Sequence, residues 1–366
     1  MRRGLIARSM VELPDAVFDT RIERVRTAMR GLDARLARVR AAMDAAGLDA
    51  FLIYTNNTRA AGVSWLTGFV PYWSEALLVV PRDREPVLVA ALSYRVKSWI
   101  ERTSRLAEVI HGPRIGFEAA SMIAARKADA AVGIADLDGL AAGIVEDLRR
   151  GGPRLSLSDS TALFAPVRAE ADPAEIALAM RAAAIAQHAL AQTPGRGASL
   201  GESIAAVEAQ ARTDGAEEVY IAAAPDLDRD RRLRRIEGEA ALGESFALRA
   251  TVAYKGTWIR LTRTFPRDGA VQPQEEAAAR LAAAVAKLPS SDGFAGFSSW
   301  LVEGCRIAQP LEPLMGSRVA TAHALAPSAL VSVQADFEIE GRRLLLGAPA
   351  LVGRRGEAAS LLVPPF

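Results

Sequence analysis

Two arginines in one segment of the chain are candidate ligand-binding groups. The segment 246–265 reads FALRATVAYKGTWIRLTRTF and carries Arg249 and Arg260 on either side of Lys255-Gly256. The alternation of apolar and polar residues predicts two strands joined at Lys255-Gly256, and pairing their apolar faces places both arginines on the common polar face. A guanidinium group can bind a carboxylate, phosphate or sulfate through two parallel hydrogen bonds. The pair is therefore a candidate anion site.

Two like charges on one face repel each other, so the arginine pair needs compensation. At a separation of roughly 6 Å and an effective dielectric constant near 20, the repulsion is on the order of 3 kcal/mol. A bound anion is one source of compensation. Structural ion pairs with acids such as Glu244, Asp336 or Glu338, or exposure to water, are another. The sequence leaves both interpretations open.

Few other side chains could transfer a proton or attack a substrate. The chain has three histidines and one cysteine. His323 is the best remaining general base, with a packed histidine in the mostly apolar stretch 319–325 as the alternative. Cys305 could act as a nucleophile only beside an activating base, and a buried small side chain is its alternative role. We expect His188 to be structural and His111 to lie in a loop.

Aromatic residues and aspartates near these groups also have two interpretations each. Tyr254 and Trp258 flank the predicted turn and could line a ligand pocket, although aromatic residues in strands more often pack. The run 226–232 (DLDRDRR) is typical of a solvated loop with local ion pairs. It lacks the central glycine and final glutamate of a calcium loop, and no glycine loop precedes a predicted helix to bind a nucleotide.

The first half of the chain predicts an α/β domain that would position none of these candidates except His111. Apolar residues at helical spacing between Ile22 and Met43 predict a helix that Gly31 could interrupt, and residues 48–54 (LDAFLIY) predict a buried strand. Strands alternating with helices argue for the α/β class. Further apolar runs that we interpret as strands lie at 63–69, 76–80, 86–92 and 131–135, followed by a helical stretch at 137–149.

The second half predicts a domain that carries most of the candidates. Asp172-Pro173-Ala174-Glu175 has a capping carboxylate, a proline at the first helical position and a glutamate three residues after the cap, which together predict a helix start. That helix should end near Gln192, and a second should run from Ser199 to about Gly215. Strands and an Ala-rich helix at 275–287 should follow. We therefore expect an α/β domain in residues 1–165 and an α+β domain in residues 166–366.

Composition excludes several classes of function. The chain has 366 residues and a net charge of +2, which gives no reason to expect a nucleic-acid partner or a polybasic membrane surface. One cysteine excludes an internal disulfide framework and a multi-thiolate metal site. No apolar run approaches the ~18 residues of a membrane span, and the first twenty residues lack the apolar core of a signal peptide. We expect a cytoplasmic protein that binds neither nucleic acid nor membrane.

Five phrases in order resemble the creatinase, prolidase and aminopeptidase P family, which has the pita-bread fold. One is the strand pair with Tyr254-Lys255-Gly256 followed by Thr262-Arg263-Thr264-Phe265. The others are 35–54, the WLTGF of 65–69, Val167-Arg168 with Asp172–Ile176, and Gly201-Glu202. The resemblance spans about residues 33–356 and implies an α/β N-terminal domain followed by an α+β pita-bread C-terminal domain.

The resemblance also implies where metal ligands would stand. Peptidases of this family bind two divalent metal ions through two Asp, one His and two Glu, which suit hard cations and an activated water. The two aspartate positions match Arg249 and Arg260, the glutamate positions match Gln334 and Gly347, and the histidine position falls near Cys305. Arginine is cationic and has no lone pair for a metal. We therefore expect neither a metal ion nor another cofactor.

Three functions follow as hypotheses. The leading one is a non-peptidase, or pseudoenzyme, that binds a small anionic molecule or serves as partner subunit of an active homologue. We expect it to form a homodimer, or a heterodimer with a related chain. Its ligand-binding residues would be Arg249, Arg260, Gln334, Tyr254 and Trp258. The alternative is a metal-independent hydrolase or lyase for a small amide, amidine or carboxylate, in which His323 or Cys305 would be catalytic. A metal-dependent Xaa-Pro peptidase is the least favoured, because the metal ligands would have to come from other positions.

Overall fold

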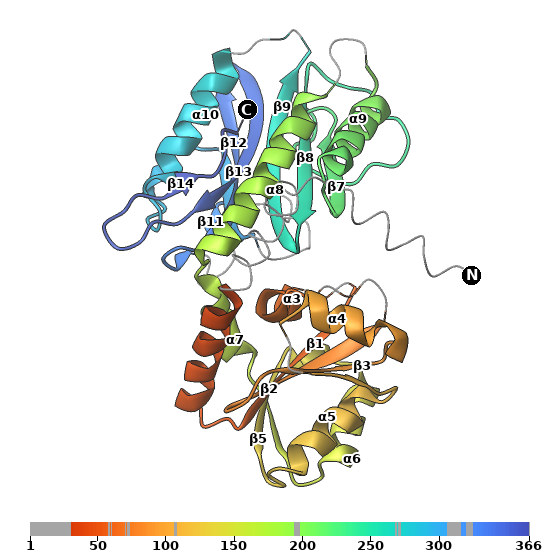
Figure 1. Cartoon of the computed structure of the whole chain (residues 1–366). Helices are drawn as coiled ribbons and strands as arrows, with labels where there is room; N and C mark the ends of the chain where they lie inside the picture. The colour runs from red at the N-terminus through yellow and green to blue at the C-terminus, as the bar shows by residue number, and fades with distance from the viewer. Residues whose placement is uncertain are drawn as a thin grey trace, which may run out of the picture.

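The computed structural model describes residues 31–365 except for 58, 60, 70, 72–73, 106–107, 194–197, 268, 270–271, 306–315 and 320–324. The described residues form two bodies, each built on one sheet (Figure 1). The first half is α/β and the second half is α+β, as the sequence predicts. No helix in the described part of the chain is both long and apolar enough to cross a membrane.

A six-stranded mixed sheet forms the centre of the N-terminal domain. Its order is β4-β3-β2-β1-β5-β6. β1 is antiparallel to β2 and parallel to β5, and a parallel pair requires a crossover connection such as a helix. The strands are β1 (Ala50–Asn56), β2 (Glu75–Pro81), β3 (Val87–Ala90), β4 (Glu108–His111), β5 (Ala131–Ala135) and β6 (Ser156–Asp159).

Helices cover both faces of this sheet because successive residues of the buried strand β1 point to opposite sides. Phe51 and Ile53 pack with the helix of residues 31–45, α3, α4 and α7. Ala50 and Leu52 pack with α5 and α6. The helices are α3 (Ala61–Thr67), α4 (Lys97–Thr103), α5 (Ile115–Ala124), α6 (Ala142–Gly151) and α7 (Thr161–Ala169), with short 3₁₀ turns at Tyr94–Val96 and Leu137–Gly139.

Two predictions for this domain differ from the structure. The apolar run 63–69 lies mainly in helix α3 and is not a strand. Its apolar residues Val63 and Leu66 are both buried, and a short apolar run cannot be assigned to helix or strand by periodicity. The stretch 137–149 is a 3₁₀ turn followed by α6, because Asp136 has a positive φ of 58° and redirects the chain. Residues 22–30 of the first predicted helix lie outside the described residues.

The long helix α8 (Pro173–Ala191) connects the two domains. Its predicted cap is confirmed, because the Asp172 side chain accepts a hydrogen bond from the backbone N–H of Glu175 at 2.9 Å. Arg35 of the N-terminal domain donates to Asp172 Oδ1 at 3.0 Å and to the carbonyl of Trp65 at 2.7 Å. The division predicted between residues 165 and 166 falls inside α7 and stays a prediction.

The C-terminal domain is built on an eight-stranded sheet. Seven strands follow the order β11-β10-β12-β13-β9-β8-β7, and β14 pairs with β13. All described pairings are antiparallel except that of β10 with β11. The strands are β7 (Glu218–Ala224), β8 (Ser245–Tyr254), β9 (Thr257–Pro266), β10 (Ser299–Gly304), β11 (Arg318–Val319), β12 (Leu330–Ile339), β13 (Arg342–Leu351) and β14 (Ser360–Leu361).

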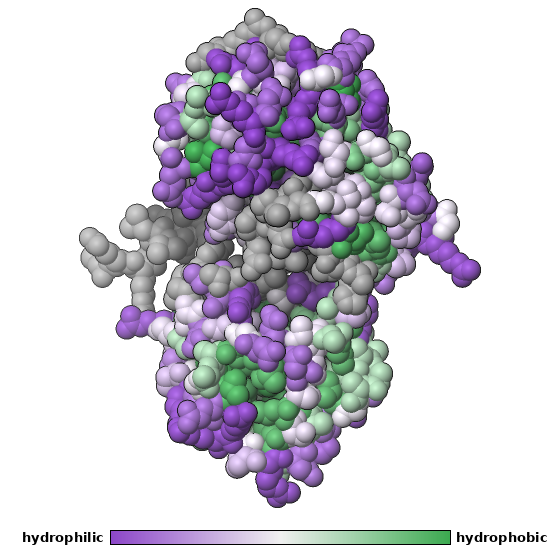
Figure 2. Space-filling view, turned by 180° about the vertical axis from the view of Figure 1, so that it is seen from behind, coloured by the Kyte–Doolittle hydropathy of each residue, from purple (hydrophilic) through white to green (hydrophobic). Residues whose placement is uncertain are grey.

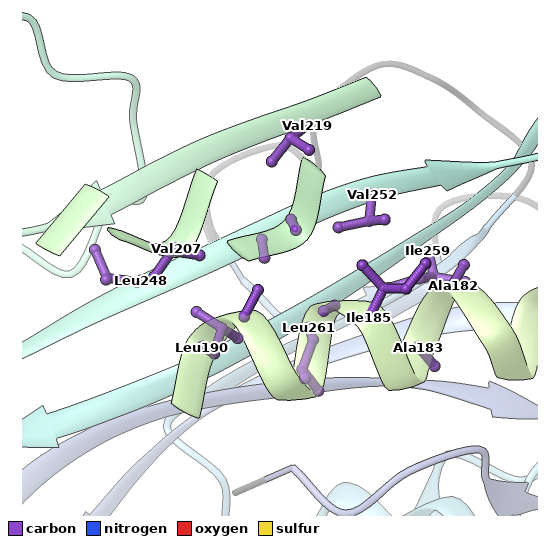
Figure 3. Packing of buried hydrophobic residues seen from close by; sticks show 14 of the residues in the cluster. Ala182, Ala183, Ile185, Leu190, Val207, Val219, Leu248, Val252, Ile259 and Leu261 are labelled. Carbon is purple, nitrogen blue, oxygen red and sulfur yellow. The ribbon is translucent and has the colours of Figure 1, made fainter. Parts of the chain in front are cut away.

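Three helices cover one face of this sheet (Figure 1). They are α8, α9 (Leu200–Thr213) and α10 (Gln272–Val285). Ile185 and Leu190 of α8 pack against Leu248, Ile259 and Leu261 of β8 and β9 (Figure 3). Seen from behind, polar side chains dominate the surface of the C-terminal domain, whereas apolar side chains gather on the N-terminal domain (Figure 2). The opposite face of the eight-stranded sheet, which we call the site face, carries the arginine pair.

The two remaining helix predictions are confirmed. At the start of α9 the Ser199 side chain accepts from the Glu202 N–H, and the Glu202 side chain accepts from the Ser199 N–H. This capping box fixes the start of the helix where the sequence places it. Helix α10 begins three residues before the predicted range and ends two before its end, which is the usual uncertainty of helix ends.

Candidate functional site

The predicted hairpin of β8 and β9 is confirmed, and its register defines the site face. Arg249 lies opposite Thr262, and Thr251 lies opposite Arg260. Directly paired residues share a face, so all four side chains lie on the same side of the sheet. The turn residues Lys255 and Gly256 have φ of 50° and 74°. Positive φ at both central residues is what a tight two-residue hairpin turn requires.

The register brings distant residues of the second half into one row across five strands. Thr262 lies opposite Gly347, Gly347 lies opposite Gln334, and Gln334 lies opposite Leu301. Arg249 extends the row at the β8 end. Its Nη1 donates a hydrogen bond to Gln334 Oε1 at 3.4 Å. Three positions that the family resemblance assigns to metal ligands therefore lie in one row, and Arg260 lies on the same face.

Both arginines are deeply buried, with 2% of Arg249 and 1% of Arg260 exposed. Burial and, to a lesser extent, the charge of Arg260 lower the pKa of Arg249 to about 10, against the opposing effect of the Glu303 carboxylate. Burial also lowers the pKa of Arg260, against the opposing effects of Cys305 and Glu303. The cationic forms are therefore disfavoured here, because desolvation and a like charge both act against them.

Glu303, which the sequence did not single out, is an acid whose charge raises the pKa of both arginines. It lies on β10, two residues after Leu301, and pairs with Ser332 in register, so alternation puts it on the site face. The acids that the sequence suggested lie elsewhere: Glu244 and Glu338 are exposed, and Asp336 has other partners. Two guanidinium groups near one carboxylate carry a net charge of +1.

Asp336 is completely buried on β12 and forms an ion pair with Arg231. Arg343 is its second cationic neighbour, at 4.0 Å. Burial raises the pKa of Asp336, and the hydrogen bond and charge of Arg231 only partly oppose that effect. Asp336 therefore pairs with Arg231, which lies in the segment between β7 and β8, and not with the arginine pair.

That segment, residues 225–244, places two leucines against the site face. Leu227 and Leu233 are buried in a cluster with Leu301 and Leu345. The same cluster also contains three alanines, Ala222, Ala224 and Ala247. Because Ala247 and Leu301 share the site face with Arg249, the leucines form an apolar cover beside the arginine pair. We call Leu227 and Leu233 the leucine cover.

The prediction of a solvated loop at 226–232 is confirmed only in part. Local ion pairs form as expected, between Arg232 and Asp230 at 2.9 Å and between Arg229 and Asp226 at 3.5 Å. Arg232 holds the pKa of Asp230 at about 2. Leu227, however, is fully buried. The run of alternating charges therefore contains one buried leucine, whose burial the charge pattern did not predict.

The two aromatic candidates lie on different faces of the sheet. Trp258 shares the face of Arg260 by alternation and stacks on Tyr220 at 5.7 Å between ring centroids. Tyr254 packs against the helix-covered core, with the guanidinium of Arg181 at 5.9 Å from its ring. The structure therefore brings Trp258, and not Tyr254, to the side of the arginine pair.

The cysteine and the histidines named as candidates lie in different parts of the chain, away from one another in sequence and element. Cys305 follows β10, is 1% exposed, and belongs to the apolar cluster beneath α8. His323 lies outside the described residues. His188, predicted to be structural, lies on α8 with its Nδ1 2.7 Å from Asp214 Oδ2. The prediction that His111 lies in a loop is wrong, because it is the last residue of β4, paired in register with Ala90.

The residues at the matched metal-ligand positions do not fit a pair of divalent cations. Two are guanidinium groups and one is an amide, none of which supplies the carboxylate oxygens that such ions need. At Gly347 an added Cβ would lie 2.8 Å from the Val333 carbonyl oxygen and 3.1 Å from Thr262 Oγ1, too close for a side chain. Among the described residues, no three His, Cys, Asp or Glu side chains group to hold a metal ion.

Known proteins resemble this chain in part of its sequence and in its fold. Residues 35–169 match the model of the creatinase/prolidase N-terminal domain. No curated protein matches the chain. A prolidase from Pyrococcus furiosus is 16% identical with a TM-score of 0.62, covering 89% of this chain and 98% of its own.

Two further solved structures show the same likeness. A Xaa-Pro dipeptidase from Bacillus anthracis is 16% identical with a TM-score of 0.64, and an X-Pro aminopeptidase from Thermotoga maritima is 14% identical with a TM-score of 0.63. Each comparison covers 90% of this chain and 97% of the other. The N-terminal part of the chain therefore matches the creatinase/prolidase N-terminal domain, and nearly the whole chain has the fold of these prolidases and aminopeptidases.

Proposed function

We propose that this chain is a non-peptidase member of the creatinase, prolidase and aminopeptidase P family that binds a small anion at the arginine pair. The observation that carries the proposal is the burial of Arg249 and Arg260 on one face of the sheet, where the family resemblance expects acidic metal ligands. A fixed positive charge repels a divalent cation and has no lone pair to bind it. The dinuclear activation of water that peptide hydrolysis would use therefore has no support at these residues.

Charge balance favours an anion at this site. Two guanidinium groups and one carboxylate, that of Glu303, bring a net positive charge to a buried place. A monovalent carboxylate would neutralise that charge and could accept two parallel hydrogen bonds from one guanidinium fork. Pairing would also offset part of the desolvation that lowers both arginine pKa values.

The neighbours of the pair favour a small ligand. Gln334 accepts the hydrogen bond of Arg249 through its side-chain oxygen, so its amide NH₂ group can donate to an anion. The leucine cover is buried on the same face, and an apolar environment strengthens a charged hydrogen bond. A formate- or acetate-sized group suits this setting better than a peptide, which needs an open groove.

The test is anion-dependent thermal stability in the wild type and in matched variants. Formate, acetate, sulfate and phosphate are compared at equal ionic strength. A carboxylate should raise the melting temperature of the wild type and should not do so in Arg249→Met or Arg260→Met. Arg263→Met is the control, because Arg263 is also buried and lies on the same strand but on the opposite face. Equal stabilisation of all four proteins would overturn the proposal.

The other hypotheses receive less support. A metal-independent hydrolase or lyase would rely on His323, which lies outside the described residues, or on Cys305, which is buried in an apolar cluster. Assembly as a homodimer, or as a heterodimer with a related chain, stays a prediction. Neither alternative rests on an observation as specific as the arginine pair.

A further inference from the structure

A cleft of about 420 Å³ opens in the N-terminal domain, on a different sheet from the arginine pair. It lies between the end of α5 and the ends of β1, β2 and β3, and its walls include Ala50, Pro81 and Ala130. Small-molecule sites in proteins have volumes of roughly 300–1,000 Å³. The cleft is therefore large enough for a small organic ligand.

The floor of the cleft is apolar. Val79, Val87 and Ile123 line it and are buried in the domain, and Met122 is half-buried beside them. Branched aliphatic side chains and a methionine offer dispersion contacts but no hydrogen bonds. The part of a ligand that reaches the floor should accordingly be a hydrocarbon.

The rim of the cleft is basic. It carries four cationic residues, Arg82, Arg84, Arg126 and Lys127, against two acids, Asp49 and Asp83. The cleft therefore has two more positive than negative groups among its lining residues.

Most of the rim cations already have partners, but one does not. Lys127 Nζ lies 2.7 Å from Asp49 Oδ2, and this hydrogen bond is the main cause of the lowered pKa of Asp49. Arg82 lies 3.3 Å from Asp44, and Arg84 lies 3.9 Å from Asp83. The exposed side chain of Arg126 forms no hydrogen bond or ion pair within the described part of the chain. An anionic group at the rim would meet Arg126 first.

We propose that this cleft binds an amphiphilic carboxylate, with its head group on Arg126 and its aliphatic tail on the floor formed by Val79, Val87, Met122 and Ile123. The charge of the rim selects the head group, and burial of the tail supplies the hydrophobic contribution. A free medium-chain fatty acid has this chemistry. The anionic surface of a lipid bilayer shares it in part, and the experiment separates the two.

The test is calorimetric titration of the full chain with decanoate below its critical micelle concentration. Decanol has the same tail without the charge, and inorganic phosphate has charge without a tail, so both should bind at least about tenfold more weakly than decanoate. Arg126→Glu should weaken decanoate binding by about tenfold or more, because an attractive charge becomes a repulsive one. Arg149→Glu, an exposed arginine on α6, is the matched control and should bind like the wild type.

Several results would overturn the proposal. Equal binding of decanol would remove the role of the head group, and equal binding of phosphate would remove the role of the tail. Unchanged decanoate affinity in Arg126→Glu would remove the site. Sedimentation with phosphatidylglycerol vesicles without binding of free decanoate would assign the cleft to a membrane surface instead. Because Arg126 is not part of the arginine pair, failure here leaves the anion site on the other sheet standing, and the reverse holds too.

Discussion

Arg249 on β8 reaches across β9 and β13 to Gln334 on β12, where its Nη1 donates to Oε1 at 3.4 Å. This hydrogen bond fixes the guanidinium group above the middle of the sheet. It also orients the Gln334 amide so that its NH₂ group is available to an acceptor. In the proposed function, the two arginines and this amide group bind the anion together.

Repulsion between the two arginines predicts a specific pattern in a double-mutant cycle. Replacing either residue with methionine removes the repulsion, and replacing both can remove it only once. The double variant Arg249→Met/Arg260→Met should therefore gain less stability than the sum of the two single changes, by about 1–3 kcal/mol. Chemical denaturation in buffer without added carboxylates measures this coupling.

Arg263→Met provides the control for that cycle. The pKa of Arg263 is lowered by burial and not by a neighbouring arginine. Its side chain lies on the opposite face of the sheet. Its coupling to Arg249→Met should stay within about 0.5 kcal/mol. Additive effects in the first cycle would show that the two cations do not interact and would remove the argument from charge balance.

The ion pair between Arg35 and Asp172 predicts an acid-sensitive connection between the domains. Burial acts to raise the pKa of Asp172, but the hydrogen bond and charge of Arg35, with the N–H of Glu175, lower it overall from the usual 3.8. The unfolded chain then binds a proton at higher pH than the folded one. The stability from this group is complete above the unfolded pKa and is lost as the pH falls through the folded pKa.

Asp172→Asn tests this ion pair while keeping the helix cap, since asparagine caps helices as well as aspartate does. We expect a loss of about 3 kcal/mol near neutral pH, because Arg35 loses its buried partner. The loss should shrink as the pH falls below 3.8. Asp44→Asn, whose pair with Arg82 is largely exposed, should change stability by less than about 0.5 kcal/mol. A loss independent of pH would count against the ion pair.

The leucine cover should contribute strongly to stability. Leu227→Ala would leave a cavity beside Leu301 and Leu345, and truncation of a fully buried leucine costs about 2–5 kcal/mol. Met180→Ala, at a site on α8 that is half exposed, should cost less than about 1 kcal/mol by comparison. Denaturation curves of the two variants measure the loss in free energy of unfolding. A similarly small loss in both would mean that the segment 225–244 does not pack on the sheet.

Gly347 should not tolerate a side chain. An added methyl group would approach the Val333 carbonyl and Thr262, so Gly347→Ala should destabilise the protein by about 1–3 kcal/mol. Gly304, at the end of β10, has no other described residue within 4 Å of an added Cβ, and Gly304→Ala should be neutral or slightly stabilising. If Gly347→Ala is as stable as Gly304→Ala, the space at this position is larger than the register indicates.

Local patterns in the sequence were sufficient to predict the hairpin and its faces. Leu248, Ala250 and Val252 alternate with polar residues, and Lys255-Gly256 supplies the turn, so the common face of both arginines follows from neighbours in sequence. The apolar run at 63–69 gave no such information, since helix α3 buries the same residues that a strand would.

The partners of the arginines could not be predicted in the same way. Glu303 reaches the site face through the register of β10 on β12, and Asp336 is paired with Arg231 from a crossing segment 105 residues away in sequence. The leucine cover depends on the same segment, in which charged residues conceal Leu227 and Leu233. These contacts depend on tertiary packing, which carries no short-range signature in the sequence.

Metal content and peptidase activity together decide whether the arginine pair has replaced a metal centre. Tag-free protein would be incubated with Mn²⁺, Co²⁺ or Zn²⁺, desalted, analysed by mass spectrometry for metals, and assayed on Xaa-Pro dipeptides with the same ions present. We expect less than about 0.1 metal ion per chain and no hydrolysis above the protein-free control, because guanidinium groups offer no ligands. Retention of about two ions per chain with metal-dependent cleavage would contradict this expectation and restore a dinuclear peptidase.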